Sequence, residues 1–222
     1  MDNNLSQFQI YDGSEFNRLK KGTIFVKLFR EDDIHNELHY KDGLNSDTKP
    51  FNRYSVAGLH FVDIKHLYDA FLNLHKKGSY WGLNYKTLEL DVYRASGYNY
   101  MRIVRIPDDA QVNMTKEGFR ASKLFLEERY IILDHPLFTI PENCLKMVSI
   151  DGRLLLFVKN QTQGICSHAI LQNPQALAYV KNQTDEICIL ALLKSNDKSI
   201  FDLIRFKPQA YYLSKSNILA KM

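Results

Sequence analysis

The chain lacks the segments that carry a protein into or across a membrane. Its first residues, MDNNLSQFQIYDG, contain no basic stretch followed by an apolar run, so they do not form a secretory signal. No segment approaches the roughly 18 consecutive apolar residues of a transmembrane helix. We therefore expect a soluble protein in a reducing compartment.

Dense charge of one sign is also missing. The formal net charge is +4, and the basic residues are spread along the 222 residues. Nucleic-acid-binding proteins more often carry a dense Lys/Arg patch. The most basic stretch is the tail after Lys198, with Lys207, Lys215 and Lys221, which we interpret as solvated helix faces, although it leaves nucleic-acid binding open. No glycine-rich phosphate loop of the Walker or Rossmann type occurs.

Cysteine is scarce, and its three occurrences are evenly spaced. Cys144, Cys166 and Cys188 are 22 residues apart each time. Zinc sites need pairs of ligands at short spacing, which an interval of this length does not supply. We expect reduced, buried cysteines and no metal.

The sequence around the cysteines repeats with the same period. The three segments read CLKMVSIDGRLLLFVKNQTQGI, CSHAILQNPQALAYVKNQTDEI and CILALLKSNDKSIFDLIRFKPQ. The first two share Lys-Asn-Gln-Thr at residues 159–162 and 181–184, whereas the third keeps only the apolar skeleton. The period indicates a repeat array after about Pro141.

Capping residues predict two helices of about nine residues in each unit. Thr162 and Thr184 are expected to cap helix starts, and Asn173, which precedes a proline, is a second start signal. Asn160 and Asn182 are candidates for the left-handed residue that ends the preceding helix. Each unit is thus predicted to be a helical hairpin.

The N-terminal part reads as a mixture of strands and helices. A helix is expected from Ile64, where apolar residues recur at helical spacing. The strands are expected at residues 23–29, 58–63, 100–106, 124–126 and 130–133. Residues 77–97, rich in Gly, Tyr and Asn, look like an insertion. The predicted fold class is an α+β N-terminal module, residues 1–135, followed by an all-α helical-hairpin repeat array, residues 136–222.

Four strings of this module resemble giant-virus repeat proteins. These are HNELHYKDGLNSDTKPFN, GLHFVDI, YMRIVRIPDDAQV and FRASKLFLEERYIIL. They are similar to the N-terminal module that precedes helical repeats in mimivirus-like proteins, and the Lys-Asn-Gln-Thr repeat is similar to degenerate repeats of the same viruses. The resemblance covers roughly residues 23–205, with the long segment 77–97 as a departure. It implies a non-enzymatic viral interaction or adaptor protein in the host cytoplasm, with a viral or host protein as partner and no cofactor.

A weaker similarity gives an alternative function. The order of residues 58–63 and of Glu-Glu-Arg-Tyr after them resembles ADP-ribosyltransferases, which bind NAD. That resemblance would give roles to His39 (or His35), His60 and Glu128, with the glutamate stabilising a cationic transition state. However, His60 occupies the place of the aromatic that stacks on nicotinamide, and no His-Gly-Thr is present. The alternative is therefore an enzyme of this class or an NAD-binding pseudoenzyme.

Aromatic residues in and beside the insertion form the remaining candidate site. A surface loop of this composition can bind a partner, although packing back onto the module explains it as well. The residues are Tyr80, Trp81, Tyr85 and Tyr98, with Tyr100 next to them.

Overall fold

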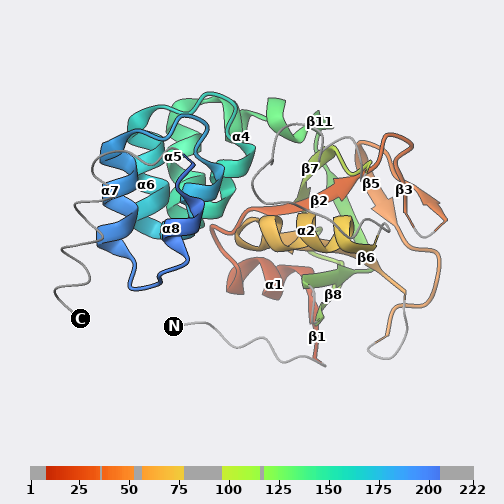
Figure 1. Ribbon diagram of the computed structural model, residues 1–222. Coiled ribbons are helices and arrows are strands. Elements are labelled where there is room, and N and C mark those ends of the chain that lie inside the picture. The colour runs from red at the N-terminus through yellow and green to blue at the C-terminus, as the bar shows by residue number, and fades with distance from the viewer. Residues whose placement is uncertain (1–8, 36, 53–56, 78–96, 116–117, 206–222) are drawn as a thin grey trace. The chain divides into compact units, whose positions relative to one another are not determined.

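The computed structural model describes residues 9–205, apart from 36, 53–56, 78–96 and 116–117 (Figure 1). These residues separate into two compact units, residues 9–131 and residues 132–205. Each unit has its own secondary structure and its own core.

The first unit is built on a nine-stranded sheet in which every described pair of neighbours is antiparallel. The order is β1-β8-β9-β6-β2-β7-β10-β5, and β11 also pairs with β7. The strands are β1 (Ile10–Asp12), β2 (Phe25–Phe29), β5 (Gly43–Ser46), β6 (Leu59–Asp63), β7 (Tyr100–Arg105), β8 (Gln111–Thr115), β9 (Gly118–Ala121), β10 (Lys123–Leu126) and β11 (Tyr130–Ile131). A separate hairpin joins β3 (Ile34–His35) to β4 (Leu38–His39).

The core of this unit is aromatic. Phe16, from α1 (Gly13–Leu19), lies edge-on to Phe61 and Phe119 at 6.1 and 5.3 Å between ring centroids. Phe25 packs in the same cluster, at 5.2 Å from Phe16. Edge-to-face contacts of this kind add to the gain from burying the rings. All five residues of β2, an inner strand between β6 and β7, are buried.

A helix follows β6, as the helical spacing of apolar residues from Ile64 predicted. Asp63 accepts a hydrogen bond from the backbone N–H of Lys65 and caps a 3-10 turn, η1 (Ile64–His66), which continues into α2 (Leu67–Lys77). Leu67 and Phe71 are fully buried and anchor this helix.

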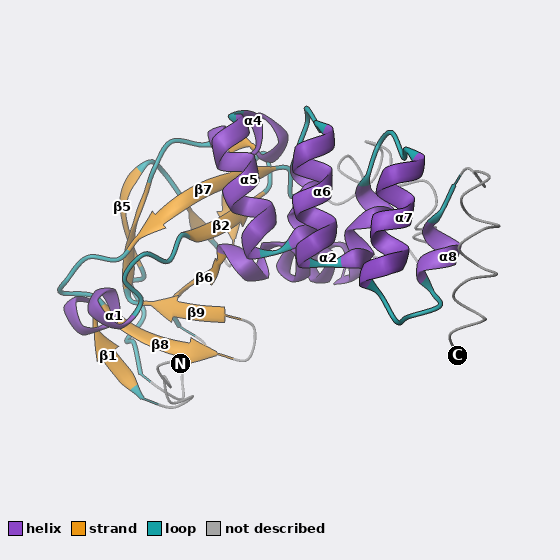
Figure 2. Cartoon of the chain, turned by 90° about the vertical axis from the view of Figure 1, so that its left-hand side faces the viewer, coloured by secondary structure: helices purple, strands orange, loops and turns teal. Residues whose placement is uncertain are grey.

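The second unit contains no strand among its described residues. After η3 (Ile132–Asp134) and α4 (Pro136–Thr139), three ten-residue helices follow: α5 (Pro141–Ile150), α6 (Gln163–Gln172) and α7 (Asp185–Lys194). They lie side by side (Figure 2). The segments between them are 3-10 helices, η4 (Gly152–Phe157) and η5 (Pro174–Tyr179), and α8 (Ile200–Leu203) follows α7.

The predicted fold class was wrong. The chain combines a nine-stranded antiparallel sheet with several helices, and the first two repeated units each pair an α-helix with a 3-10 helix instead of a second α-helix. In these two units the backbone of the second segment forms hydrogen bonds between residues three apart, such as Leu154 N–H to Asp151 O at 2.9 Å. A ten-residue α-helix is about 15 Å long, and six residues rise about 12 Å as a 3-10 helix but only about 9 Å as an α-helix. Six residues wound as a 3-10 helix therefore run back along more of the neighbouring ten-residue α-helix than six residues of α-helix would.

The helix starts in the second unit were predicted correctly, but the helix ends were not. Thr162 and Thr184 accept hydrogen bonds from Ile165 N–H and Ile187 N–H, and Asn173 caps η5. Asn160 and Asn182 are not left-handed, because Asp33 and Glu37 are the only non-glycine residues with positive φ in the described chain. The 3-10 helices end in extended backbone instead.

Candidate functional site

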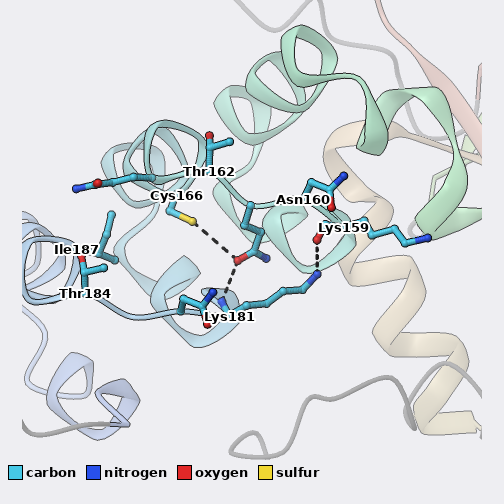
Figure 3. A pocket seen from close by; sticks show the side chains of 10 residues that line it. Lys159, Asn160, Thr162, Cys166, Lys181, Thr184 and Ile187 are labelled. Atoms are coloured by element: carbon cyan, nitrogen blue, oxygen red, sulfur yellow. Dashed lines mark hydrogen bonds between the residues drawn. The ribbon is translucent and has the colours of Figure 1, made fainter.

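The repeated Lys-Asn-Gln-Thr segments form a pocket in the second unit. Its volume is about 450 Å³. The first segment, residues 159–162, lies on one side, and Lys181, Asn182 and Thr184 of the second lie on the other. Figure 3 shows Lys181 extended along the pocket toward the main chain at Lys159. Gln163, Cys166 and Ile187, from α6 and α7, complete the lining.

Gln161 forms the structural link beneath this pocket. Its side-chain amide donates to Leu155 O in its own unit at 3.1 Å and to Tyr179 O in the next unit at 2.9 Å. Its side-chain oxygen accepts from the backbone N–H of Lys181 at 2.9 Å. One glutamine thus satisfies three backbone groups and clamps two units together.

Gln183 repeats this clamp one unit further along. Its amide donates to Leu177 O and to Leu203 O, both at 3.0 Å, and its oxygen accepts from Arg205 N–H at 2.9 Å. The third unit has lost the Lys-Asn-Gln-Thr motif, but its main chain still completes the clamp.

Two lysines give the pocket its charge. The ammonium group of Lys181 donates to Val158 O at 3.2 Å and to Lys159 O at 2.7 Å. Burial of this group, and then the charge of Lys159, lower the pKa of Lys181. Lys159 itself forms an exposed ion pair with Asp134 at 3.0 Å. No carboxylate is among the ten residues that line the pocket.

The asparagines of the motif are the polar groups that the fold does not use. Asn160 and Asn182 are exposed, and within the described residues their side-chain amides have no hydrogen-bond partner. Each amide offers an N–H donor and a carbonyl acceptor. The glutamines and threonines of the motif, in contrast, hold the units and cap the helices.

The cysteines are packing residues, as predicted. Cys144, Cys166 and Cys188 are free thiols with 2%, 4% and 2% of their surface exposed. Burial raises the pKa of all three, and that of Cys166 to about 11. In the described part of the chain, no three His, Cys, Asp or Glu residues are grouped as metal ligands.

A second cluster of buried charge lies in the first unit, around Lys27. Lys27 is 3% exposed, and its ammonium group donates to His60 O at 2.8 Å and lies 3.2 Å from Nδ1 of His35. The Tyr40 ring centroid is 4.7 Å away. Burial lowers the pKa of Lys27 to about 7.

Arg102 connects this cluster to the β3–β4 hairpin. It donates to both carboxylate oxygens of Asp33, at 2.7 and 3.1 Å, and to Asp42 at 3.0 Å. Arg129 adds a second contact to Asp33, at 3.0 Å. Paired, hydrogen-bonded charges of this kind fix geometry more than they add stability, and we regard the cluster as structural.

The structure does not bring the candidate transferase residues together. His60 lies on β6, and Glu128 lies beside β11, where it accepts from the Tyr130 hydroxyl at 2.8 Å. β2 and β7 run between β6 and β11, so about 14 Å separates the two strands. His39 is exposed on the β3–β4 hairpin. No hydrogen bond or ion pair links these three residues among the described contacts.

The predicted aromatic loop falls mostly on residues that the structure does not describe. Tyr80, Trp81 and Tyr85 lie outside the described residues, as does nearly all of the segment 77–97. Tyr98 is half-buried, and the guanidinium of Arg30 lies 5.5 Å from its ring centroid.

Sequence reasoning missed the Lys27 cluster and the glutamine clamps. A lysine within the apolar string TIFVKLF was a signal for a buried cation, because charged residues are rarely fully buried unless they are paired. The glutamines were visible as repeated residues, but their partners are main-chain groups that no sequence pattern marks.

A scan against models of protein families gives no match for this chain. Searches of curated proteins and of solved structures find no similar chain either. The resemblance to giant-virus repeat proteins thus stays a prediction. Within the described residues, no helix is long and apolar enough to span a membrane.

Proposed function

We propose that this chain is a protein-interaction module and that it holds a segment of a partner protein in the pocket between residues 159–162 and 181–184. The observation that carries the proposal is the pair of asparagines, Asn160 and Asn182. Both are exposed at the pocket, at equivalent positions of successive units, without partners in the described chain. Stacked repeats commonly bind partners along such extended surfaces.

The rigidity of the pocket supports this function. Gln161, Thr162 and Lys181 are held by hydrogen bonds to the backbone, so the lining is arranged before a ligand binds. A preorganised surface loses little side-chain freedom on binding. The origin in a giant virus and the host cytoplasm are predictions that rest on the resemblance alone.

The transferase alternative receives no support from the placement of its residues. His60 on β6 and Glu128 beside β11 lie apart, because β2 and β7 run between these two strands. We therefore propose no enzymatic function.

The test is selection of random 12-residue peptides, displayed on phage, against the immobilised full chain. Selected peptides are then measured against the double variant Asn160→Ala/Asn182→Ala. We expect peptides that bind the original chain and lose binding to the variant, while the variant keeps its unfolding midpoint. Failure to select any peptide, or peptides that bind both chains equally, would refute the proposal.

A further inference from the structure

The charges around the pocket indicate which partner it suits. Its lining carries two ammonium groups and no carboxylate. The charge of Lys159 acts unfavourably on Lys181, so an anionic group between them would relieve repulsion. Asp185 and Glu186, in the first turn of α7, are the acidic residues next along the chain, and neither lines the pocket.

Both lysines can accept a new carboxylate. Lys159 pairs with Asp134, and their side chains are 60% and 50% exposed. Exposed ion pairs contribute little stability, so Lys159 can exchange Asp134 for another carboxylate at little cost. Lys181 uses two of its three N–H donors on carbonyls and retains one without a partner among the described residues. The two cations occupy equivalent positions, one in each unit.

The spacing of the units sets the conformation of the partner. Packed helices such as α6 and α7 are typically about 8–10 Å apart. Three residues of an extended polyproline-type chain span about 9.3 Å and return the same face. An extended segment would therefore present an equivalent side chain to each unit at every third residue.

We propose that the pocket binds an acidic, extended segment of a partner protein with carboxylates three residues apart. One carboxylate pairs with Lys159 and the other with Lys181. The amides of Asn160 and Asn182 pair with the main chain of the segment. This inference rests on the proposed function and adds to it the chemistry of the partner. The pocket lining has no aromatic side chain on which a base could stack, which favours a peptide over a single-stranded nucleic acid.

The experiment uses the full chain and fluorescein-labelled peptides, with binding measured by anisotropy. The probe is Pro-Pro-Glu repeated four times. One control is Pro-Pro-Gln repeated four times, and a second has the same composition with its four glutamates contiguous. We expect the periodic acidic peptide to bind at least tenfold more tightly than either control, and its binding to weaken as salt increases.

Matched variants assign the site. Lys159→Gln and the double variant Asn160→Ala/Asn182→Ala should each weaken binding about tenfold or more. Lys146→Gln makes the same change of charge at an exposed position on α5 and should leave binding unchanged. Equal binding of the acidic and neutral peptides, an equal loss in Lys146→Gln, or tighter binding of a 12-nucleotide single-stranded RNA would overturn the inference.

The outcomes separate the inference from the proposed function. Neutral or basic peptides that are selected from the random library and need Asn160 and Asn182 would retain the function and refute the acidic partner. Absence of any pocket-dependent peptide would refute both.

Discussion

Lys27 and Arg102 lie directly opposite each other on β2 and β7, and both are almost completely buried. Arg102 has two carboxylates as partners, Asp33 and Asp42, whereas Lys27 has none in the described chain. Like charges opposite each other across a sheet are destabilising. The ammonium group of Lys27 is instead surrounded by polar partners: the backbone carbonyl of His60, the imidazole of His35 and the face of the Tyr40 ring.

The stability of the first unit should therefore depend on the protonation of Lys27. Its pKa is lowered from 10.5 to about 7 in the folded chain, so between these values the unfolded chain binds more protons. Stability contributed through this group should rise with pH from about 7 to about 10. Lys27→Met should raise the free energy of unfolding by about 1–3 kcal/mol at pH 6 and by less at pH 10. Urea unfolding at both pH values measures this; a gain that is equal at both would contradict the assignment.

Asp33→Asn should destabilise the first unit by about 3–5 kcal/mol, because it leaves Arg102 buried with only Asp42 as a charged partner. Asp33 has φ 53°, a conformation that asparagine also tolerates, so the loss reports on charge and not on backbone strain. Arg105→Gln breaks an exposed pair with Glu127 and should cost less than about 1 kcal/mol. Similar losses in the two variants would argue against a buried network.

Gln161→Ala should lower the free energy of unfolding of the second unit by about 2–3 kcal/mol, because it removes three hydrogen bonds to the backbone, those with Leu155 O, Tyr179 O and Lys181 N–H. Gln163→Ala, at an exposed position in the first turn of α6, is the matched control and should change stability little. Denaturation followed by circular dichroism compares them. Equal stability of the two variants would show that the clamp contributes nothing measurable.

Two glycines of the second unit should respond to alanine with opposite signs. A Cβ at Gly152 would lie 2.2 Å from Ala169 O, so Gly152→Ala forces η4 away from α6 and should destabilise by about 2 kcal/mol or more. A Cβ at Gly164 would meet only Thr162 Oγ1, at 3.9 Å, so Gly164→Ala should stabilise α6 by about 0.5–1 kcal/mol. Thermal unfolding of both variants decides the matter, and a shift in the same direction would count against the packing described.

The three thiols should react only after unfolding. They are buried with raised pKa values, so the thiolate is rare at pH 8 as well as inaccessible. The thiols of the native protein should react slowly with a chromogenic disulfide reagent, and the unfolded protein should consume three equivalents of it. Rapid labelling of the native chain would be inconsistent with this packing.

The sequence predicted local features better than tertiary ones. The caps Thr162, Thr184 and Asn173 form as expected, because a capping side chain and its backbone partner are neighbours in sequence. The order of strands in the sheet could not be predicted, because β6, β2 and β7 pair across long intervening segments. Several strands, including β1, β5, β8 and β9, carry too few apolar residues in alternation to stand out.

For the candidate site too, the local sequence feature was visible and the tertiary contacts were not. The repeated motif at residues 159–162 and 181–184 is visible in the sequence, but it was interpreted as helix caps and helix ends and not as a binding site. The roles within it were not visible: Gln161 holds main-chain atoms of the next unit, whereas Asn160 is left exposed.

The partners of each glutamine in the neighbouring unit are backbone atoms, Tyr179 O and Lys181 N for Gln161 and Leu203 O and Arg205 N for Gln183. These hydrogen bonds do not depend on which side chains the neighbouring unit carries. Substitution on the outer surface of a unit can therefore proceed without uncoupling it from the one before. The unit after α7 illustrates this, since it lacks the motif, has Arg205 where the unit before has Lys181, and is still joined through the same two kinds of atom.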